Sequence, residues 1–220
     1  MSSQEELALG EKSYKESLSE LKVITGTKDA LRVQTIGQKI AVAANQPNYK
    51  WEFNLVEDNQ ANAFCLPGGK VVVYTGILKY AKNDDQLATV ISHEVAHALA
   101  RHGAERVTQG MIQQGVGLIG SVAVAATAPQ YQNAFNQAYG LGSNLGVMLP
   151  YGRMQESEAD EIGIYLMHKA GYNVNEATKF WENMSEGKSG GNDFFSTHPS
   201  SQNRTKDIQT VINKIGNEAK

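Results

Sequence analysis

The sequence predicts a single α+β domain in which helices surround a small group of strands. Its 220 residues are 41% hydrophobic and 20% charged, a composition with which one globular domain can bury a core. Most of the chain repeats apolar residues at helical spacing, whereas strand-like patterns gather in residues 49–76. The net charge of −3 gives no electrostatic case for a nucleic-acid partner.

Two helices with a structural role are expected first. Residues 4–24 place apolar side chains among charged ones, and residues 29–44 repeat this pattern until Asn45-Gln46-Pro47 ends it. The first six residues contain no basic region followed by an apolar stretch, so no signal peptide is expected within them.

Residues 49–76 predict a strand and then a hairpin. Bulky and polar residues alternate over 49–56, which is the period of a half-buried strand. Two extended runs then flank Pro67-Gly68-Gly69 within residues 60–76. An exposed edge of this hairpin can pair with an extended peptide, and a purely structural hairpin is the alternative. The only cysteine, Cys65, is expected to be a small buried residue.

The next predicted helix begins at Asn83 or Asp84 and contains His93-Glu94-Val95-Ala96-His97. Because residues four apart share a helical face, both imidazoles can bind one zinc ion. Glu94 leaves the helix about 100° round from His93, which suits a general base acting on water better than a further ligand. An amphipathic helix whose histidines have this spacing by chance is the alternative.

An acidic cluster in a later predicted helix offers the third ligand. Glu156 could join the two histidines and leave one position open for water, the arrangement of a catalytic zinc. Asp160, four residues on and on the same face, could accept the N–H of the ligating His93. Glu158 points elsewhere and is the competing ligand, and a solvated acidic face is the alternative for the cluster.

Residues 107–152 carry no charge. Residues 115–128 are almost wholly apolar but too short and glycine-rich for a confident membrane span, so a buried helix behind the active site is expected. Residues 130–152 are rich in Gln, Asn, Tyr and Gly, which predicts a loop. This loop is either an ordinary connection or a cover for the cleft that touches a membrane or a partner.

The C-terminal part predicts a helix over 175–185, a glycine-rich linker over 187–192 and a last helix to about Gly216. His198 lies in a turn before Pro199 and could donate to the oxyanion of a tetrahedral intermediate, with Arg204 supporting it or the substrate backbone. A surface histidine is the alternative. His102 and His168 are expected to be ordinary helix residues, with His102 near a helix C-terminus.

Four motifs together resemble metallopeptidase family forty-eight over roughly residues 5–215. This family includes the CAAX prenyl proteases, the HtpX heat-shock proteases, the mitochondrial Oma proteases and small soluble bacterial envelope proteases. The motifs are Asn62-Ala63-Phe64 with Pro67-Gly68-Gly69, His93-Glu94-x-x-His97, Arg153-x-x-Glu156-x-Glu158-Ala159-Asp160, and His198-Pro199-Ser200 with Arg204.

The resemblance implies one zinc ion per chain and a gluzincin fold, mostly helical around a small mixed sheet with an edge strand at the active-site cleft. It implies a role for each matched residue: His93, His97 and Glu156 as metal ligands, Glu94 as the catalytic base, Asp160 as the partner of a ligand, His198 as the transition-state stabiliser, and Asn62, Ala63 and Phe64 as the substrate-binding edge. One metallopeptidase domain over residues 1–220 is expected, with N-terminal helices over 1–47, the sheet and metal helix over 48–103, the uncharged helix and loop over 104–152, and the third-ligand and C-terminal helices over 153–220.

The expected function is a zinc-dependent endopeptidase that hydrolyses extended or misfolded proteins in bacterial envelope quality control. The soluble bacterial branch of the family implies a periplasmic or envelope location, with a lipid anchor on the full-length precursor and peripheral contacts with a membrane or with envelope proteins. The alternative is a chaperone-like module that binds unfolded or assembling envelope proteins and has weak or gated catalysis. The sequence carries no indication of the oligomeric state.

Overall fold

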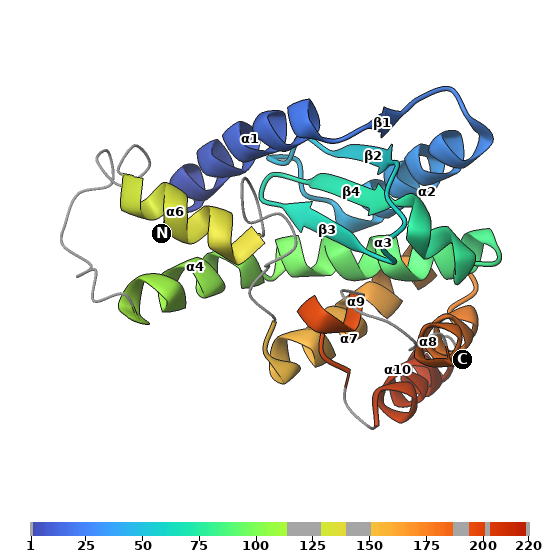
Figure 1. Cartoon of the computed structure of the whole chain (residues 1–220). Helices are drawn as coiled ribbons and strands as arrows, with labels where there is room; N and C mark the ends of the chain where they lie inside the picture. The colour runs from blue at the N-terminus through green and yellow to red at the C-terminus, as the bar shows by residue number, and fades with distance from the viewer. Residues whose placement is uncertain (1, 114–128, 140–150, 187–193, 201–202, 219–220) are drawn as a thin grey trace.

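The computed structural model of this chain describes residues 2–113, 129–139, 151–186, 194–200 and 203–218 (Figure 1). Its fold is α+β, as predicted, with helices packed against both faces of one small mixed sheet. The expected helix over 115–128 and the linker over 187–192 lie outside the described residues.

The sheet has the strand order β1-β2-β4-β3 in the part of the chain that the structure describes. Strand β2 runs parallel to β4, while β1 and β3 pair antiparallel with β2 and β4. Gly68 and Gly69 have φ angles of 84° and 85° and make the turn of the predicted hairpin, which leaves β3 at the edge. The strand bounds are Val23–Ile24 for β1, Glu52–Val56 for β2, Ala63–Leu66 for β3 and Lys70–Tyr74 for β4.

Helices cover both faces of the sheet. Because successive side chains of a strand point to opposite sides, each strand contributes side chains to two cores. Val71 and Val73 of β4 join the core formed with α2 (Lys28–Ala44) and α3 (Asp84–Leu99). Val72 and Tyr74 join a second core with α1 (Ser3–Glu20) and α6 (Pro129–Tyr139). The strands therefore carry near-continuous apolar runs in place of a polar outer face.

Helix α3 crosses the middle of the molecule between the sheet and the C-terminal helices (Figure 1). The side chain of Asn83 caps its N-terminus by accepting from the backbone N–H of Gln86. Every residue from 86 to 98 is buried, because α3 packs against α2, β3, α7 (Arg153–Lys169) and α8 (Glu176–Glu186). Polar side chains on α3 consequently lie inside the protein.

The N-terminal helix is shorter than predicted. Helix α1 ends at Glu20, and the following residues become the strand β1 that pairs with β2. The β-branched pair Val23 and Ile24 favours this extended conformation, but two residues show no period from which a strand could be predicted. Helix α2 confirms the second prediction, with Thr27 as its N-cap and Asn45 in the left-handed conformation at its end.

Part of the expected loop over 130–152 is helical. Residues 129–139 form α6, which buries Ala134, Phe135 and Ala138 next to the sheet and α1. The burial of this apolar face stabilises a helix that its polar composition did not indicate. The remaining described elements are η1 (Thr75–Lys79), α4 (His102–Gln113), α9 (Phe194–Thr197) and α10 (Arg204–Glu218).

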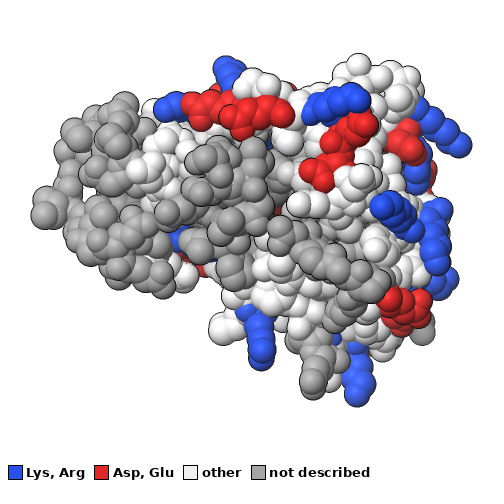
Figure 2. All heavy atoms as spheres, in the orientation of Figure 1, with Lys and Arg blue, Asp and Glu red and all other residues white. Residues whose placement is uncertain are grey.

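Charged side chains of both signs lie side by side on the surface. Figure 2 shows this along α1, where Lys15 pairs with Glu11 and Lys12 with Glu16, at N–O distances of 3.1 and 4.0 Å. Pairs of this kind suit a solvated helix face. Among the described residues, no helix combines the length and hydrophobicity that a membrane crossing requires.

Candidate metal centre

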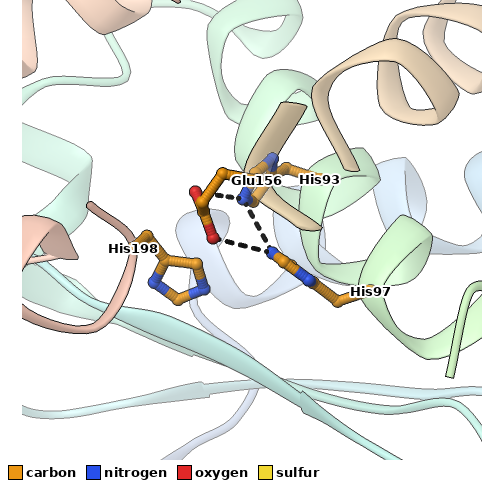
Figure 3. Close-up of side chains that lie close together, drawn as sticks. All are labelled: His93, His97, Glu156 and His198. Carbon is orange, nitrogen blue, oxygen red and sulfur yellow. Dashed lines mark hydrogen bonds and ion pairs between the residues drawn. The ribbon is translucent and has the colours of Figure 1, made fainter. Parts of the chain in front are cut away.

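Helices α3 and α7 bring two histidines and a glutamate together. His93 and His97 lie on one face of α3, and Glu156 reaches between them from the first turn of α7 (Figure 3). The Glu156 carboxylate oxygens lie 3.4 Å from His93 Nε2 and 3.2 Å from His97 Nε2. The two Nε2 atoms are 3.1 Å apart. This places the three predicted ligands around one point.

His198 completes a cluster of four donor groups. It follows α9, stacks on the ring of Phe194 at 3.9 Å and approaches the ligands from a segment across from α3 (Figure 3). One ligand atom from each of His93, His97, Glu156 and His198 can be chosen so that all four lie within 4.8 Å of one another. His198 is therefore a buried residue of the site, not a surface histidine.

Glu94 points toward His198. Its Oε1 atom lies 3.3 Å from His198 Nε2, and both side chains are fully buried. The carboxylate and the imidazole consequently border the same small volume beside Glu156.

The polar atoms of this cluster fit a bound cation. Both carboxylate oxygens of Glu94 and of Glu156, and Nε2 of His198, have no hydrogen-bond partner among the described residues. Buried carboxylates without such partners are costly in free energy. A metal ion between them would bind these oxygen and nitrogen atoms and compensate for the missing hydrogen bonds. Two imidazoles and a carboxylate are also a donor set that zinc accepts.

Burial and charge set the protonation states of the site. Burial, with a smaller effect of the Glu156 carboxylate, raises the pKa of Glu94 to about 8. Burial opposes protonation of His93, but the carboxylates of Glu156 and Asp160 outweigh it and raise the pKa of this imidazole to about 9. Burial lowers the pKa of His97 and of His198 well below the ordinary value. The carboxylates that hold a proton on His93 would equally attract a metal cation.

Asp160 lies behind His93, where the sequence placed it. Its Oδ1 atom is 3.0 Å from His93 Nδ1 and 2.7 Å from Nη2 of Arg204. Burial alone would raise the pKa of Asp160, but Arg204 and His93 lower it below the ordinary value. An ionised Asp160 can accept the Nδ1–H of His93 and leave Nε2 directed at the centre.

Arg204 lies against Trp181 and beside two carboxylates of the site. Its guanidinium lies 3.5 Å from the ring of Trp181, and its side chain is 5% exposed. It also lies 3.5 Å from Oε2 of Glu156. Arg204 therefore contacts Asp160 and Glu156 directly, and its predicted support of His198 or of the substrate backbone stays a prediction.

The predicted substrate edge lies directly beside the site. Ala63 and Phe64 begin β3, and the side chain of Asn62 accepts from the backbone N–H of Ala63. The backbone N–H of Phe194 donates to the carbonyl of Ala61 at 2.9 Å, so α9 docks where the edge strand starts. The side chains of Ala63 and Phe64 are buried, which leaves the backbone as the part of β3 that a peptide could reach.

Several residues of the site had no signal in the sequence. Tyr151 stacks on His97 at 3.7 Å, and Arg106 lies 3.5 Å above the Tyr151 ring. His102 is buried against His97 at the start of α4, although an ordinary position near a helix C-terminus was expected. Glu158, the competing ligand, contacts His102 and not the donor cluster. The contacts of Tyr151 and Glu158 join segments far apart in the chain, and that of His102 depends on the turn after α3, so no local pattern reveals them.

A cavity of about 130 Å³ adjoins the site between α7 and α10. Its wall includes Glu156, Asp160 and Arg204, with Ile208 and Val211 of α10 on the apolar side. The ligand carboxylate therefore borders open space on the side away from β3.

A glutamate from one helix and a His-Glu-x-x-His helix facing it define the donor set of a metallopeptidase. The chain belongs to Peptidase family M48, whose model matches residues 27–212. Metallopeptidases of this family are metal-dependent, and the cluster around Glu156 is the group of donors to which that dependence points.

Three curated relatives show how far the similarity extends. The chain is 36% identical over 210 residues to the mitochondrial metalloendopeptidase OMA1 of Schizosaccharomyces pombe, covering 93% of this chain and 60% of that protein. It is 39% identical over 169 residues to OMA1 of Arabidopsis thaliana, covering 76% of this chain and 32% of that protein. It is 28% identical over 189 residues to the β-barrel assembly-enhancing protease of Escherichia coli K12, covering 83% of this chain and 39% of that protein. The chain thus spans between about one third and three fifths of these relatives.

Proposed function

We propose that this chain is a zinc-dependent endopeptidase with a gluzincin fold. The observation that carries the proposal is the convergence of His93, His97 and Glu156 on one point, with Glu94 beside it. Three protein ligands leave a fourth position for water or substrate, which distinguishes catalytic from structural zinc sites. The names of the relatives, which describe endopeptidases and a protease, support the same reaction.

In the proposed reaction each residue has one task. A bound zinc ion supplies Lewis-acid chemistry that polarises the scissile carbonyl and acidifies water. His93, His97 and Glu156 hold the ion, and Asp160 orients His93 through Nδ1. Glu94 takes a proton from the attacking water and passes it to the leaving amine.

His198 stabilises the negative charge that develops on the carbonyl oxygen. Its Nδ1 atom lies 2.8 Å from the hydroxyl of Thr197, and Nε2 faces the volume beside Glu94. A neutral imidazole with the proton on Nε2 can donate to an oxyanion there. The lowered pKa of His198 supports this neutral form.

Extended protein segments are the proposed substrates. Strand β3 is the edge of the sheet and lies against α3, so a peptide added beside it would run past Glu94 and His97. Backbone pairing demands extension more than a particular sequence, which favours unfolded or misfolded proteins. A role in bacterial envelope quality control is supported by the relative named for β-barrel assembly, whereas the OMA1 relatives are mitochondrial.

A second candidate is a binding module with gated catalysis. The donor atom of His198 lies within reach of the other three, and four protein ligands would close a tetrahedral zinc site. Such a chain would hold unfolded or assembling envelope proteins at β3 without cleaving them until His198 withdrew.

Metal removal and restoration test the proposal. The full chain is treated with a chelator, dialysed and reloaded with one equivalent of zinc, and the cleavage of a fluorescent unfolded protein is followed at each stage. We expect cleavage to disappear with the metal and to return with zinc. Binding of the unfolded protein without cleavage in the zinc-loaded chain would favour the gated module.

A further inference from the structure

His97 has a ring nitrogen that the proposed reaction leaves unassigned. Its Nε2 atom faces Glu156 and His93, whereas its Nδ1 atom lies 2.9 Å from Nδ1 of His102. Nε2 of His102 in turn lies 3.1 Å from Oε2 of Glu158. The His102 ring is 1% exposed and contacts both groups. It therefore links His97 at the centre to the carboxylate of Glu158 at the surface.

One arrangement of protons satisfies all of these contacts. If Nε2 of His97 binds a metal ion, the proton of the neutral ring lies on Nδ1 and is donated. Nδ1 of His102 then accepts, and its own proton lies on Nε2. From there it is donated to the Glu158 carboxylate, which is an acceptor only.

We propose that His102 and Glu158 are positioning residues that fix the orientation and the tautomer of His97. The proposal rests on the metal centre assigned above. Partners of this kind orient metal-ligating imidazoles and raise their basicity. His93 has its own partner in Asp160, at 3.0 Å. Helix α7 therefore supplies three carboxylates to the site: Glu156 to the ion, Asp160 to one histidine directly, and Glu158 to the other through His102.

The backbone between the two histidines is shaped for this contact. In a continuous helix, residue 102 would lie about 140° round the axis from His97 and could not touch it. Helix α3 ends at Leu99, and Arg101 has a φ angle of 58°, in the left-handed region that non-glycine residues seldom adopt. The chain turns there, and α4 starts with the His102 ring beside His97. Arg101 is held in this turn by an ion pair with Glu6 of α1, at 2.7 Å.

Zinc affinity tests the proposal independently of catalysis. The dissociation constant of zinc is measured by competition with a chromophoric chelator for the full-length wild type and for His102→Phe, with circular dichroism as the check on folding. We expect His102→Phe to bind zinc about 10- to 100-fold more weakly, because the Nδ1–H of His97 loses its acceptor. His102→Asn offers an amide oxygen near the lost nitrogen and should restore most of the affinity.

His168 provides the matched control. It lies exposed on α7, outside the described metal cluster, so His168→Phe removes an imidazole from the chain without touching the site. Its zinc affinity should equal that of the wild type. Wild-type affinity in a folded His102→Phe variant would overturn the proposal.

Glu158→Gln keeps the test decisive if His102→Phe does not fold. The Glu158 side chain is 60% exposed, so its replacement leaves the core intact. We expect zinc affinity to fall several-fold, less than in His102→Phe, because the Gln oxygen can still accept from His102 but carries no negative charge. If His102→Phe does fold, the same change added to it should have no further effect, because the link is already broken. Unchanged affinity in Glu158→Gln alone would overturn the role of Glu158.

Ring-nitrogen NMR of the zinc-loaded wild type reads the tautomers directly. We expect the proton of His97 on Nδ1 and that of His102 on Nε2, and the opposite tautomer of His102 would contradict the proposal. A wild type that binds no zinc would refute the metal centre itself. Tight zinc binding that does not change in His102→Phe would refute only this inference.

Discussion

His198 stands between two roles that its position permits. Its Nε2 atom faces Glu94 at 3.3 Å, as an oxyanion donor requires, and it also lies within 4.8 Å of the ligand atoms. Replacement of the imidazole has opposite effects in the two cases. A donor would be lost from the transition state, whereas a fourth ligand would be removed from the metal.

His198→Ala is predicted to lower kcat about 10²- to 10³-fold, because an oxyanion donor typically contributes that much. Zinc content, measured by atomic absorption, should remain one per chain, and KM should change little because His198 acts on the transition state. Higher activity in this variant would contradict the donor role and favour a gated site.

Removal of the Arg204 side chain should destabilise the fold. Its guanidinium is buried between Trp181 and the carboxylate of Asp160. Arg204→Ala leaves that carboxylate buried without its main positive partner, which we expect to destabilise the fold by about 3–5 kcal/mol. Urea unfolding measures this loss, with the exposed Lys206→Ala as the control on the same helix. Equal midpoints for the two variants would contradict the buried pair.

The contacts of Arg204 could not be predicted from the sequence, whereas those of several other site residues could. Spacing placed His93 with His97 and Glu156 with Asp160, because each pair lies on one helical face. The resemblance to the family implied that the two pairs meet. The stacking of Arg204 on Trp181 depends on how α8 and α10 pack, which no local pattern encodes. The same applies to His102, whose contact with His97 requires the turn after α3.

At the scale of elements, the close approach of α3 and α7 sets the ligand geometry. A side chain on Gly163 of α7 would bring its Cβ atom to 3.2 Å from the backbone nitrogen of His93. The two helices can therefore lie near enough for Glu156 to reach both histidines only because residue 163 has no side chain.

Gly163→Val is predicted to destabilise the protein by about 1–3 kcal/mol, since the extra atoms must push the two backbones apart. It should also weaken zinc binding, because Glu156 and Asp160 move with α7. A Cβ atom on Gly216 of α10 would meet no neighbouring atom within 4 Å, so Gly216→Ala is the control and should stabilise the chain by at most about 1 kcal/mol. Thermal unfolding and chelator competition measure both effects.

A carboxylate of α8 binds the start of α3. Glu176 accepts from Asn83 and Gln86 of α3 and pairs with Lys179. These hydrogen bonds, that from Lys179 foremost, lower the pKa of Glu176 to about 2.

Because the pKa of Glu176 is lower in the folded chain, its contribution to stability should be present above about pH 4.5 and be lost as the pH falls toward 2. Glu176→Gln should therefore make urea unfolding less dependent on pH over that window. If the unfolding free energies of the variant and the wild type changed equally with pH, Glu176 would not join the two helices.

For the whole molecule, the sequence was most informative where one element carries the pattern. The helical spacing of α3 and α7, the Pro67-Gly68-Gly69 turn and the α+β class all follow from local periodicity. Strand β1 could not be predicted, because its two residues show no period. Helix α6 could not be predicted, because its uncharged residues form a buried apolar face only by packing on α1 and the sheet.

The same packing gives the molecule its functional arrangement. The sheet presents β3 as its edge on one side of α3, and the C-terminal helices bring Glu156, Asp160 and His198 to the other. A peptide held at the edge would meet the donor cluster along α3. Cleavage of extended chains is the activity that we propose for this arrangement.

Digestion of casein by the zinc-loaded wild type and by Glu94→Gln tests this claim most directly, with metal content measured in both. Glu94→Gln is nearly isosteric and leaves His93, His97 and Glu156 in place, so zinc should bind equally in the two proteins. We predict cleavage by the wild type alone. Absence of cleavage by both proteins, each with one zinc per chain, would contradict the peptidase, and cleavage by both would contradict Glu94 as the base.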